Sequence, residues 1–135
     1  MSGWNGVQRV VPSRMSRRPS VLGSVTAVVP VPFDRIRPLM TAQTAPVLLG
    51  LDRGAATTVS VDVDPTTDTL GLQGQFWYRG EYTFTAHPRG TEIAYRIKNV
   101  SGQPDVIIRL WQRRILRRQQ HDLDAFAAAL PARLP

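Results

Sequence analysis

The sequence predicts an α+β fold, in which an antiparallel sheet packs against one long C-terminal helix. In segments 75–86 and 93–97, aromatic and aliphatic residues recur at every second position, as they do in strands that bury one face. From about residue 104 to residue 130 the apolar residues change to a helical period. A chain of 135 residues has room for one domain with its own core.

Positive charge is concentrated near the N-terminus. The formal net charge is +7. The first twenty residues contain no acidic residue but four arginines: Arg9, Arg14, Arg17 and Arg18. We therefore expect residues 1–20 to form a disordered basic tail and residues 21–135 to form the folded domain.

The composition excludes several classes of protein. The chain has no cysteine, which removes disulfides, thiolate metal sites and cysteine nucleophiles. It contains no run of about 18 apolar residues, so we expect no transmembrane segment. The N-terminal residues lack the apolar core of a secretion signal, which predicts a cytoplasmic location.

The first elements of the domain are short and are separated by prolines and glycines. Residues 21–29 are rich in β-branched side chains and predict the first strand, which ends at a Pro-Val-Pro sequence. Residues 33–41 predict a short helix whose length is limited by Pro38. The apolar stretch 47–51 predicts another strand.

Two further strands are expected before the aromatic segments. Residues 57–63 alternate between valine and polar residues, the pattern of a half-buried antiparallel strand. Residues 64–68 contain two aspartates, two threonines and a proline, which favour a turn. Residues 69–73 then begin the next strand.

The two aromatic segments form a hairpin whose register can be predicted. A two-residue loop at 88–89 places Tyr82 opposite Tyr95 and Phe84 opposite Ile93 on the apolar side. A slip of one residue would expose all these side chains to water, so the register should be firm.

The polar side of the same hairpin contains charged residues on both strands. Glu81 faces Arg96, a favourable exposed pair. Arg79 faces Lys98, and their repulsion predicts that the ladder frays or bulges at this point.

The C-terminal segment predicts one amphipathic helix that ends at Pro131. A step of about 100° per residue gathers its apolar side chains into one stripe: Ile108, Trp111, Ile115, Leu116, Leu123, Phe126, Ala127 and Leu130. The opposite face carries a ridge of four arginines: Arg113, Arg114, Arg117 and Arg118. Gln112 and Gln119 interrupt the stripe. A buried glutamine without a partner costs about 1–3 kcal/mol, so each must meet a protein group, water or a ligand.

Three stretches of sequence resemble the START-like (SRPBCC) superfamily, which includes polyketide cyclase/dehydrase and lipid-transport proteins. Residues 25–36 resemble its first strand and Pro-led helix, residues 80–93 its later hairpin with Gly-Thr after the turn, and residues 122–130 the end of its final helix. The resemblance implies a helix-grip fold, in which a curved antiparallel sheet wraps around the C-terminal helix. The short segment after the first strand predicts a small or partly filled pocket.

The resemblance implies a binding or carrier protein for a small hydrophobic molecule, such as a lipid, polyketide or quinone-like compound. The expected cavity between sheet and helix has a candidate lining of ten residues: Phe76, Tyr78, Tyr82, Phe84, Tyr95, Ile97, Trp111, Gln112, Ile115 and Gln119. One alternative is that these side chains simply fill one another's space. Others are a cyclase- or dehydratase-like enzyme that uses the same pocket, or a basic module that contacts nucleic acid or protein through the arginine ridge.

Signals for catalysis or cofactors are weak. His87 lies in a predicted turn and His121 on the basic helix face, and neither has a recognisable partner. Asp62, Asp64 and Asp68 lack the other ligand positions of a calcium loop, so we expect no metal or cofactor. Nucleic acid is disfavoured because the aromatic side chains should point inward, whereas a homodimer is compatible with the sequence.

Overall fold

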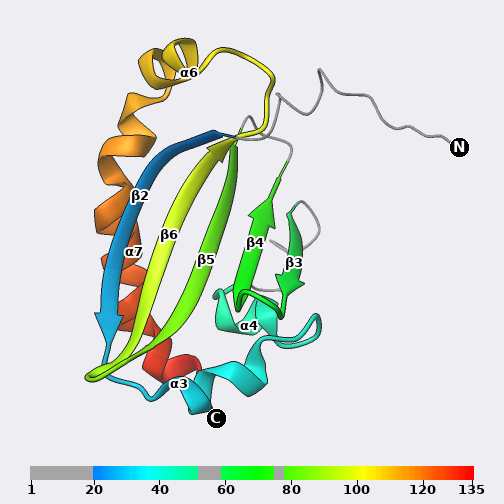
Figure 1. Ribbon diagram of the computed structural model, residues 1–135, viewed down its shortest axis with the longest axis vertical. Helices are drawn as coiled ribbons and strands as arrows, with labels where there is room; N and C mark the ends of the chain where they lie inside the picture. Colours follow the sequence, from blue (N-terminus) through cyan, green and yellow to red (C-terminus); the bar gives the residue numbers. More distant parts are fainter. Residues whose placement is uncertain (1–19, 52–58, 75–77) are drawn as a thin grey trace, which may run out of the picture.

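In the computed structural model, residues 20–51, 59–74 and 78–135 are described. Their strands form one antiparallel sheet of order β2-β6-β5-β4-β3 (Figure 1). The strands are β2 (Ser20–Val29), β3 (Ser60–Asp64), β4 (Thr69–Gln73), β5 (Tyr78–His87) and β6 (Gly90–Asn99). The expected α+β class is therefore confirmed. The basic tail expected at residues 1–20 lies outside the described residues, except for Ser20.

One face of the sheet is covered by the long C-terminal helix α7 (Arg113–Arg133), which lies mainly along β2 and also contacts β6 (Figure 1). The buried side chains of α7 recur every three or four residues: Gln119, Leu123, Phe126 and Leu130. Leu123 and Leu130 belong to one core cluster with Phe84 and Ile93 of the hairpin. The amphipathic period of the sequence thus correctly predicts which side of this helix packs against the sheet.

Short helical segments close the end of the sheet that lies near the C-terminus: α3 (Phe33–Ile36), the 3-10 turn η1 (Arg37–Leu39) and α4 (Ala45–Leu48) (Figure 1). The helix expected over residues 33–41 is confirmed in its position. The strand expected over residues 47–51 is wrong, because residues 45–48 form α4. Ala45 and Leu48 are buried while Val47 is 58% exposed, so the buried residues are three apart, as in a helix. The segment is too short for this period to be recognised in the sequence.

The hairpin has the predicted register. Tyr82 pairs with Tyr95 and Phe84 with Ile93, and the loop consists of residues 88 and 89. The expected fraying at Arg79 and Lys98 is wrong, since the ladder continues as far as Tyr78 and Asn99. The reason lies in Glu81, which forms ion pairs with both cations instead of with Arg96.

The Gly-Thr sequence after the hairpin turn fixes the path of the chain from β2 into α3. Gly90 has φ +138° and lies against the carbonyl group of Val29. The buried Thr91 hydroxyl donates a hydrogen bond to the carbonyl oxygen of Val31 at 2.7 Å. The end of β2 is thereby joined to the start of β6 by backbone packing and by a buried hydrogen bond.

The C-terminal segment forms two helices rather than the expected single one. α6 (Asp105–Trp111) ends at Gln112, whose φ of −117° and ψ of 26° interrupt the helix before α7 begins. No proline or glycine causes the break. Before it, Ile108 is buried, whereas Trp111 at the end of α6 is 65% exposed. The expected end at Pro131 is also wrong, because α7 continues to Arg133. None of the helices in the described ranges combines the length and apolarity needed to span a bilayer.

Candidate functional site

An aromatic stack lies between the sheet and α7. The rings of Tyr82 and Tyr95 are nearly parallel, with centroids 4.5 Å apart. The ring of Phe126 from α7 stacks on Tyr82 with centroids 4.7 Å apart. The antiparallel register places the two tyrosines side by side, and the helical period brings Phe126 over them. Much of the space expected for a cavity is therefore occupied by side chains.

The tyrosines of this apolar layer are partly exposed to solvent. Tyr78, Tyr82 and Tyr95 are each partly exposed, whereas Phe84, Ile97 and Leu123 are buried. The reason is the position of α7, which lies along β2 and leaves part of the hairpin uncovered (Figure 1). We call Tyr78, Tyr82 and Tyr95 the tyrosine shelf.

Two of the shelf tyrosines, Tyr82 and Tyr95, are kept in their neutral form. Burial raises the pKa of Tyr82 to about 12, and the hydrogen bond with Tyr95 only partly opposes this effect. Burial also raises the pKa of Tyr95 well above its ordinary value, to which the neighbouring Tyr82 adds. At neutral pH both hydroxyl groups are protonated, and because one of them donates to the other, one O–H of the pair is left to donate a further hydrogen bond.

Gln119 is the polar group that lies deepest beside the shelf. Its side chain is 3% exposed, and its amide nitrogen donates to the carbonyl oxygen of Tyr95 at 3.0 Å. Its Oε1 lies over Gly23 of β2, where a Cβ atom would clash with it. Gly23 thus supplies the space that lets the glutamine amide reach past the edge strand β2 to the carbonyl group of Tyr95 on β6.

Substitution of Gly23 by alanine is expected to displace the Gln119 amide from its hydrogen bond. The expected loss in the free energy of unfolding is about 1–3 kcal/mol, because a buried polar group would be left without its partner. In a Gln119→Ala background the same Gly23→Ala change should cost much less. Urea unfolding of the two single variants and the double variant measures the coupling, and additive losses would contradict this account.

The ten residues proposed to line the cavity lie in several environments. Tyr78, Tyr82 and Tyr95 form the shelf, and Phe84, Ile97 and Gln119 are buried beside it. Ile115 is half-buried in the first turn of α7, and Gln112 lies at the break between the two helices. Trp111 is 65% exposed, so its expected inward position is wrong. Phe76 lies outside the described residues.

Neither of the two histidines belongs to the tyrosine shelf. His87 belongs to the hairpin turn, where its Nδ1 accepts a hydrogen bond from the backbone N–H of Arg89 at 3.0 Å. It also borders a hollow of about 430 Å³ beside the start of α3. His121 is exposed on α7.

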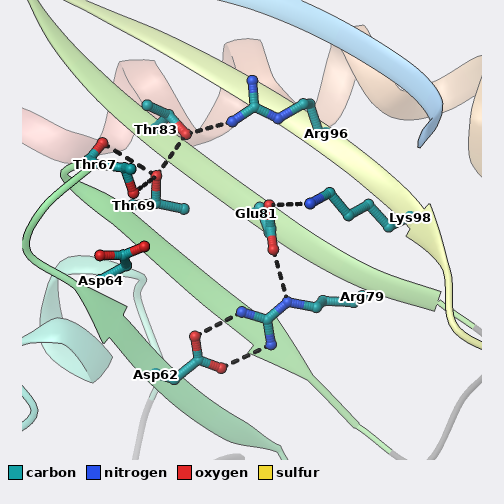
Figure 2. A pocket seen from close by; sticks show the side chains of 9 residues that line it. All are labelled: Asp62, Asp64, Thr67, Thr69, Arg79, Glu81, Thr83, Arg96 and Lys98. Atoms are coloured by element: carbon teal, nitrogen blue, oxygen red, sulfur yellow. Dashed lines mark hydrogen bonds and ion pairs between the residues drawn. The ribbon is translucent and has the colours of Figure 1, made fainter. Parts of the chain in front are cut away.

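The opposite face of the sheet carries a polar hollow of about 380 Å³ (Figure 2). Side chains from four strands and from the turn before β4 line it: Asp62, Asp64, Thr67, Thr69, Arg79, Glu81, Thr83, Arg96 and Lys98. Three carboxylates and three cations are present among them, so the lining has no formal net charge. This balance does not favour a strongly charged ligand.

A chain of ion pairs crosses this hollow from β3 to β6. The Arg79 guanidinium donates to both carboxylate oxygens of Asp62, at 2.6 and 2.7 Å, and its Nε lies 2.9 Å from Glu81. Lys98 lies 2.9 Å from the other Glu81 oxygen. Gly71 of β4 leaves the space that Arg79 crosses, because a Cβ there would clash with the guanidinium.

The ion pairs lower the pKa of both carboxyl groups. The hydrogen bond from Arg79 holds the pKa of Asp62 below its ordinary value. For Glu81, burial acts to raise the pKa, but hydrogen bonds from Arg79 and Lys98 outweigh it and the net change is downward. Both groups are therefore ionised at neutral pH, and their ion pairs link β3, β5 and β6.

A second chain of hydrogen bonds crosses the hollow beside the ion pairs (Figure 2). The hydroxyl groups of Thr67, Thr69 and Thr83 follow one another at 3.0 and 2.8 Å. Arg96 donates to Thr83 at 2.6 Å. In the part of the chain that the structure describes, Arg96 forms no ion pair, which differs from its expected pairing with Glu81.

Compared with known proteins, the chain matches no protein-family model, no curated protein and no solved structure. The relation to the START-like superfamily therefore stays a prediction from sequence.

Proposed function

We propose that the chain is a helix-grip protein that binds a small apolar molecule, such as a lipid, polyketide or quinone-like compound, on the tyrosine shelf. The observation that carries this proposal is the partial exposure of Tyr78, Tyr82 and Tyr95 beside the buried side chains of Phe84, Ile97 and Leu123. Partly exposed aromatic faces bordered by an apolar core favour a flat or extended apolar ligand.

The polar groups at the shelf suit orientation of a ligand rather than catalysis. Both Tyr82 and Tyr95 have a raised pKa and stay protonated at neutral pH. One of the two hydroxyl groups donates to the other, so the pair keeps one O–H that can donate to a carbonyl or hydroxyl group of the ligand. A tyrosine acting as general base would need a lowered pKa instead. Binding is therefore the better supported function than a cyclase-like reaction.

The bound molecule takes the place of the Phe126 ring over Tyr82. Phe126 belongs to α7 and not to the sheet, so displacement of its ring uncovers one face of Tyr82 without moving a strand. A pocket that opens in this way accepts a small ligand, which agrees with the small or partly filled pocket expected from the sequence.

Binding is tested on the full chain by native mass spectrometry of freshly purified protein, followed by thermal melting with anilinonaphthalene sulfonate as apolar probe. A probe at about 100 times its Kd should add about 2.7 kcal/mol to the free energy of unfolding and raise Tm by about 10 °C. Tyr82→Trp should reduce this shift, because the larger ring changes the shelf that the probe contacts.

Thr85→Trp is the matched control, since it introduces the same side chain on the same strand at an exposed position of the opposite face. This variant should keep the full shift in Tm. The proposal is wrong if no small molecule copurifies and no apolar probe raises Tm, or if the two tryptophan variants change the shift equally.

A further inference from the structure

Large apolar side chains are exposed together on the short helix α6. Val106, Leu110 and Trp111 are 69%, 64% and 65% exposed. Val106 and Leu110 are four residues apart and share one side of α6, while Trp111 is the last residue of this helix; Ile108, which projects away from Val106, is buried. Three of the five large hydrophobic residues found exposed in the described part of the chain thus belong to this one helix.

Contacts at the start of α6 fix which side of it faces outward. The Asp105 carboxylate accepts hydrogen bonds from the Ser20 hydroxyl at 2.7 Å and from the Asn99 amide at 3.0 Å. These bonds join α6 to the first residue of β2 and the last residue of β6. α6 lies at the end of the molecule opposite the C-terminus, so its apolar side is accessible there (Figure 1).

Exposed arginines accompany these apolar residues in α6 and follow them in the first turns of α7. They are Arg109, Arg113, Arg114, Arg117 and Arg118. Within the described ranges only Arg118 of these five forms an ion pair, with Asp122 at 3.9 Å. We call these arginines together with Val106, Leu110 and Trp111 the α6 patch.

We infer that the α6 patch docks on the surface of an anionic lipid bilayer. Aliphatic and tryptophan side chains are the residues that enter the boundary between head groups and acyl chains. Arginines beside them bind lipid phosphates and gain from the negative surface potential of anionic lipids. This inference does not depend on the tyrosine shelf, because the patch is a separate surface.

The sequence before Ser20 supports an anionic partner. It contains four arginines and no acidic residue, and the chain enters the domain beside α6 through the Ser20–Asp105 contact. This segment therefore contains no negative charge that would neutralise the arginines of the patch. Its own positive charge also favours an anionic surface.

Other partners fit the patch less well. A second copy of the chain would bring five more arginines against the first five, and like charges across an interface oppose association. Nucleic acid would contact the arginines but would leave Val106 and Leu110 without an apolar partner.

The test is co-sedimentation of the full chain with vesicles of phosphatidylcholine alone or with about 30% phosphatidylglycerol. The protein should bind the anionic vesicles about tenfold more strongly or better, and binding should weaken as salt is raised. The Leu110→Asp/Trp111→Asp variant should lose about tenfold or more in vesicle binding. The Arg113→Gln/Arg114→Gln variant should lose binding to anionic vesicles only.

Val47→Asp is the matched control, because Val47 is an exposed apolar residue of α4 outside the patch. It should bind vesicles like the unchanged protein, and circular dichroism should show that all variants are folded. The inference is overturned if Leu110→Asp/Trp111→Asp binds vesicles normally while neutralising the four N-terminal arginines abolishes binding. It is also overturned if the patch variants disrupt a homodimer or DNA binding and no vesicle binding occurs.

Discussion

Replacement of Gly90 by alanine is expected to destabilise the protein by about 3–5 kcal/mol. Gly90 has φ +138°, which an alanine adopts only with strain. Its Cβ would also clash with the carbonyl oxygen of Val29 and lie 2.9 Å from the backbone nitrogen of Val31. These neighbours are backbone atoms that cannot rotate aside, so either the hairpin or the end of β2 must move. Urea unfolding should show a lower midpoint with an unchanged slope.

Gly102→Ala is the control for this prediction. Gly102 has φ +83°, but no atom lies within 4 Å of the position of its Cβ. Alanine there should cost only about 1 kcal/mol, the effect of backbone strain without a clash. Equal losses from the two variants would contradict the close packing of Gly90 against β2.

The sheet was predictable where local signals agreed with one another. In the hairpin, the alternation of Tyr82 and Phe84 with polar residues, the two-residue loop and the facing residues of the next strand all required one register. The strands on either side of the Asp64–Asp68 turn were predictable for the same reason. These features depend on residues close in sequence, so a single sequence predicts them.

The parts that were predicted wrongly depend on contacts between distant residues. α4 has only four residues, too few for a period to distinguish helix from strand. The break at Gln112 follows α6, whose first residue Asp105 is hydrogen-bonded to β2 and β6, and no residue type marks this break. Trp111 lies directly before the break and is exposed to solvent, a position that a continuous helical period does not predict.

The candidate sites were predictable to different degrees. Alternation placed Tyr82 and Tyr95 on the face that α7 covers, but it could not show that Phe126 fills the space between them. The polar hollow was missed, because it requires the register of β3 and β4 with β5. Gly71 pairs with Asp62 on one side and with Glu81 on the other. Its missing side chain was the one feature of the sequence that indicated space for Arg79 to cross β4.

Glu81→Gln is expected to lower the free energy of unfolding by about 1–3 kcal/mol. The change removes the carboxylate that lies between Arg79 and Lys98, so two cations would face each other across β5 and β6. The side chains of Arg79, Glu81 and Lys98 are only 19%, 14% and 26% exposed, so water screens this repulsion incompletely. Loss of the second cation in Glu81→Gln/Lys98→Gln should restore part of the stability.

Glu92→Gln is the matched control, because Glu92 is the other glutamate of the chain and forms no ion pair within the described ranges. It should change the free energy of unfolding by less than about 0.5 kcal/mol. The pKa of Glu81 is lowered in the folded protein, so its contribution is fully present above the ordinary value of 4.5 and is lost as the pH falls below it. Urea midpoints of the unchanged protein and Glu81→Gln should therefore differ at neutral pH and converge in acid. A difference that persists in acid would mean that Glu81 stabilises the sheet by packing rather than by its charge.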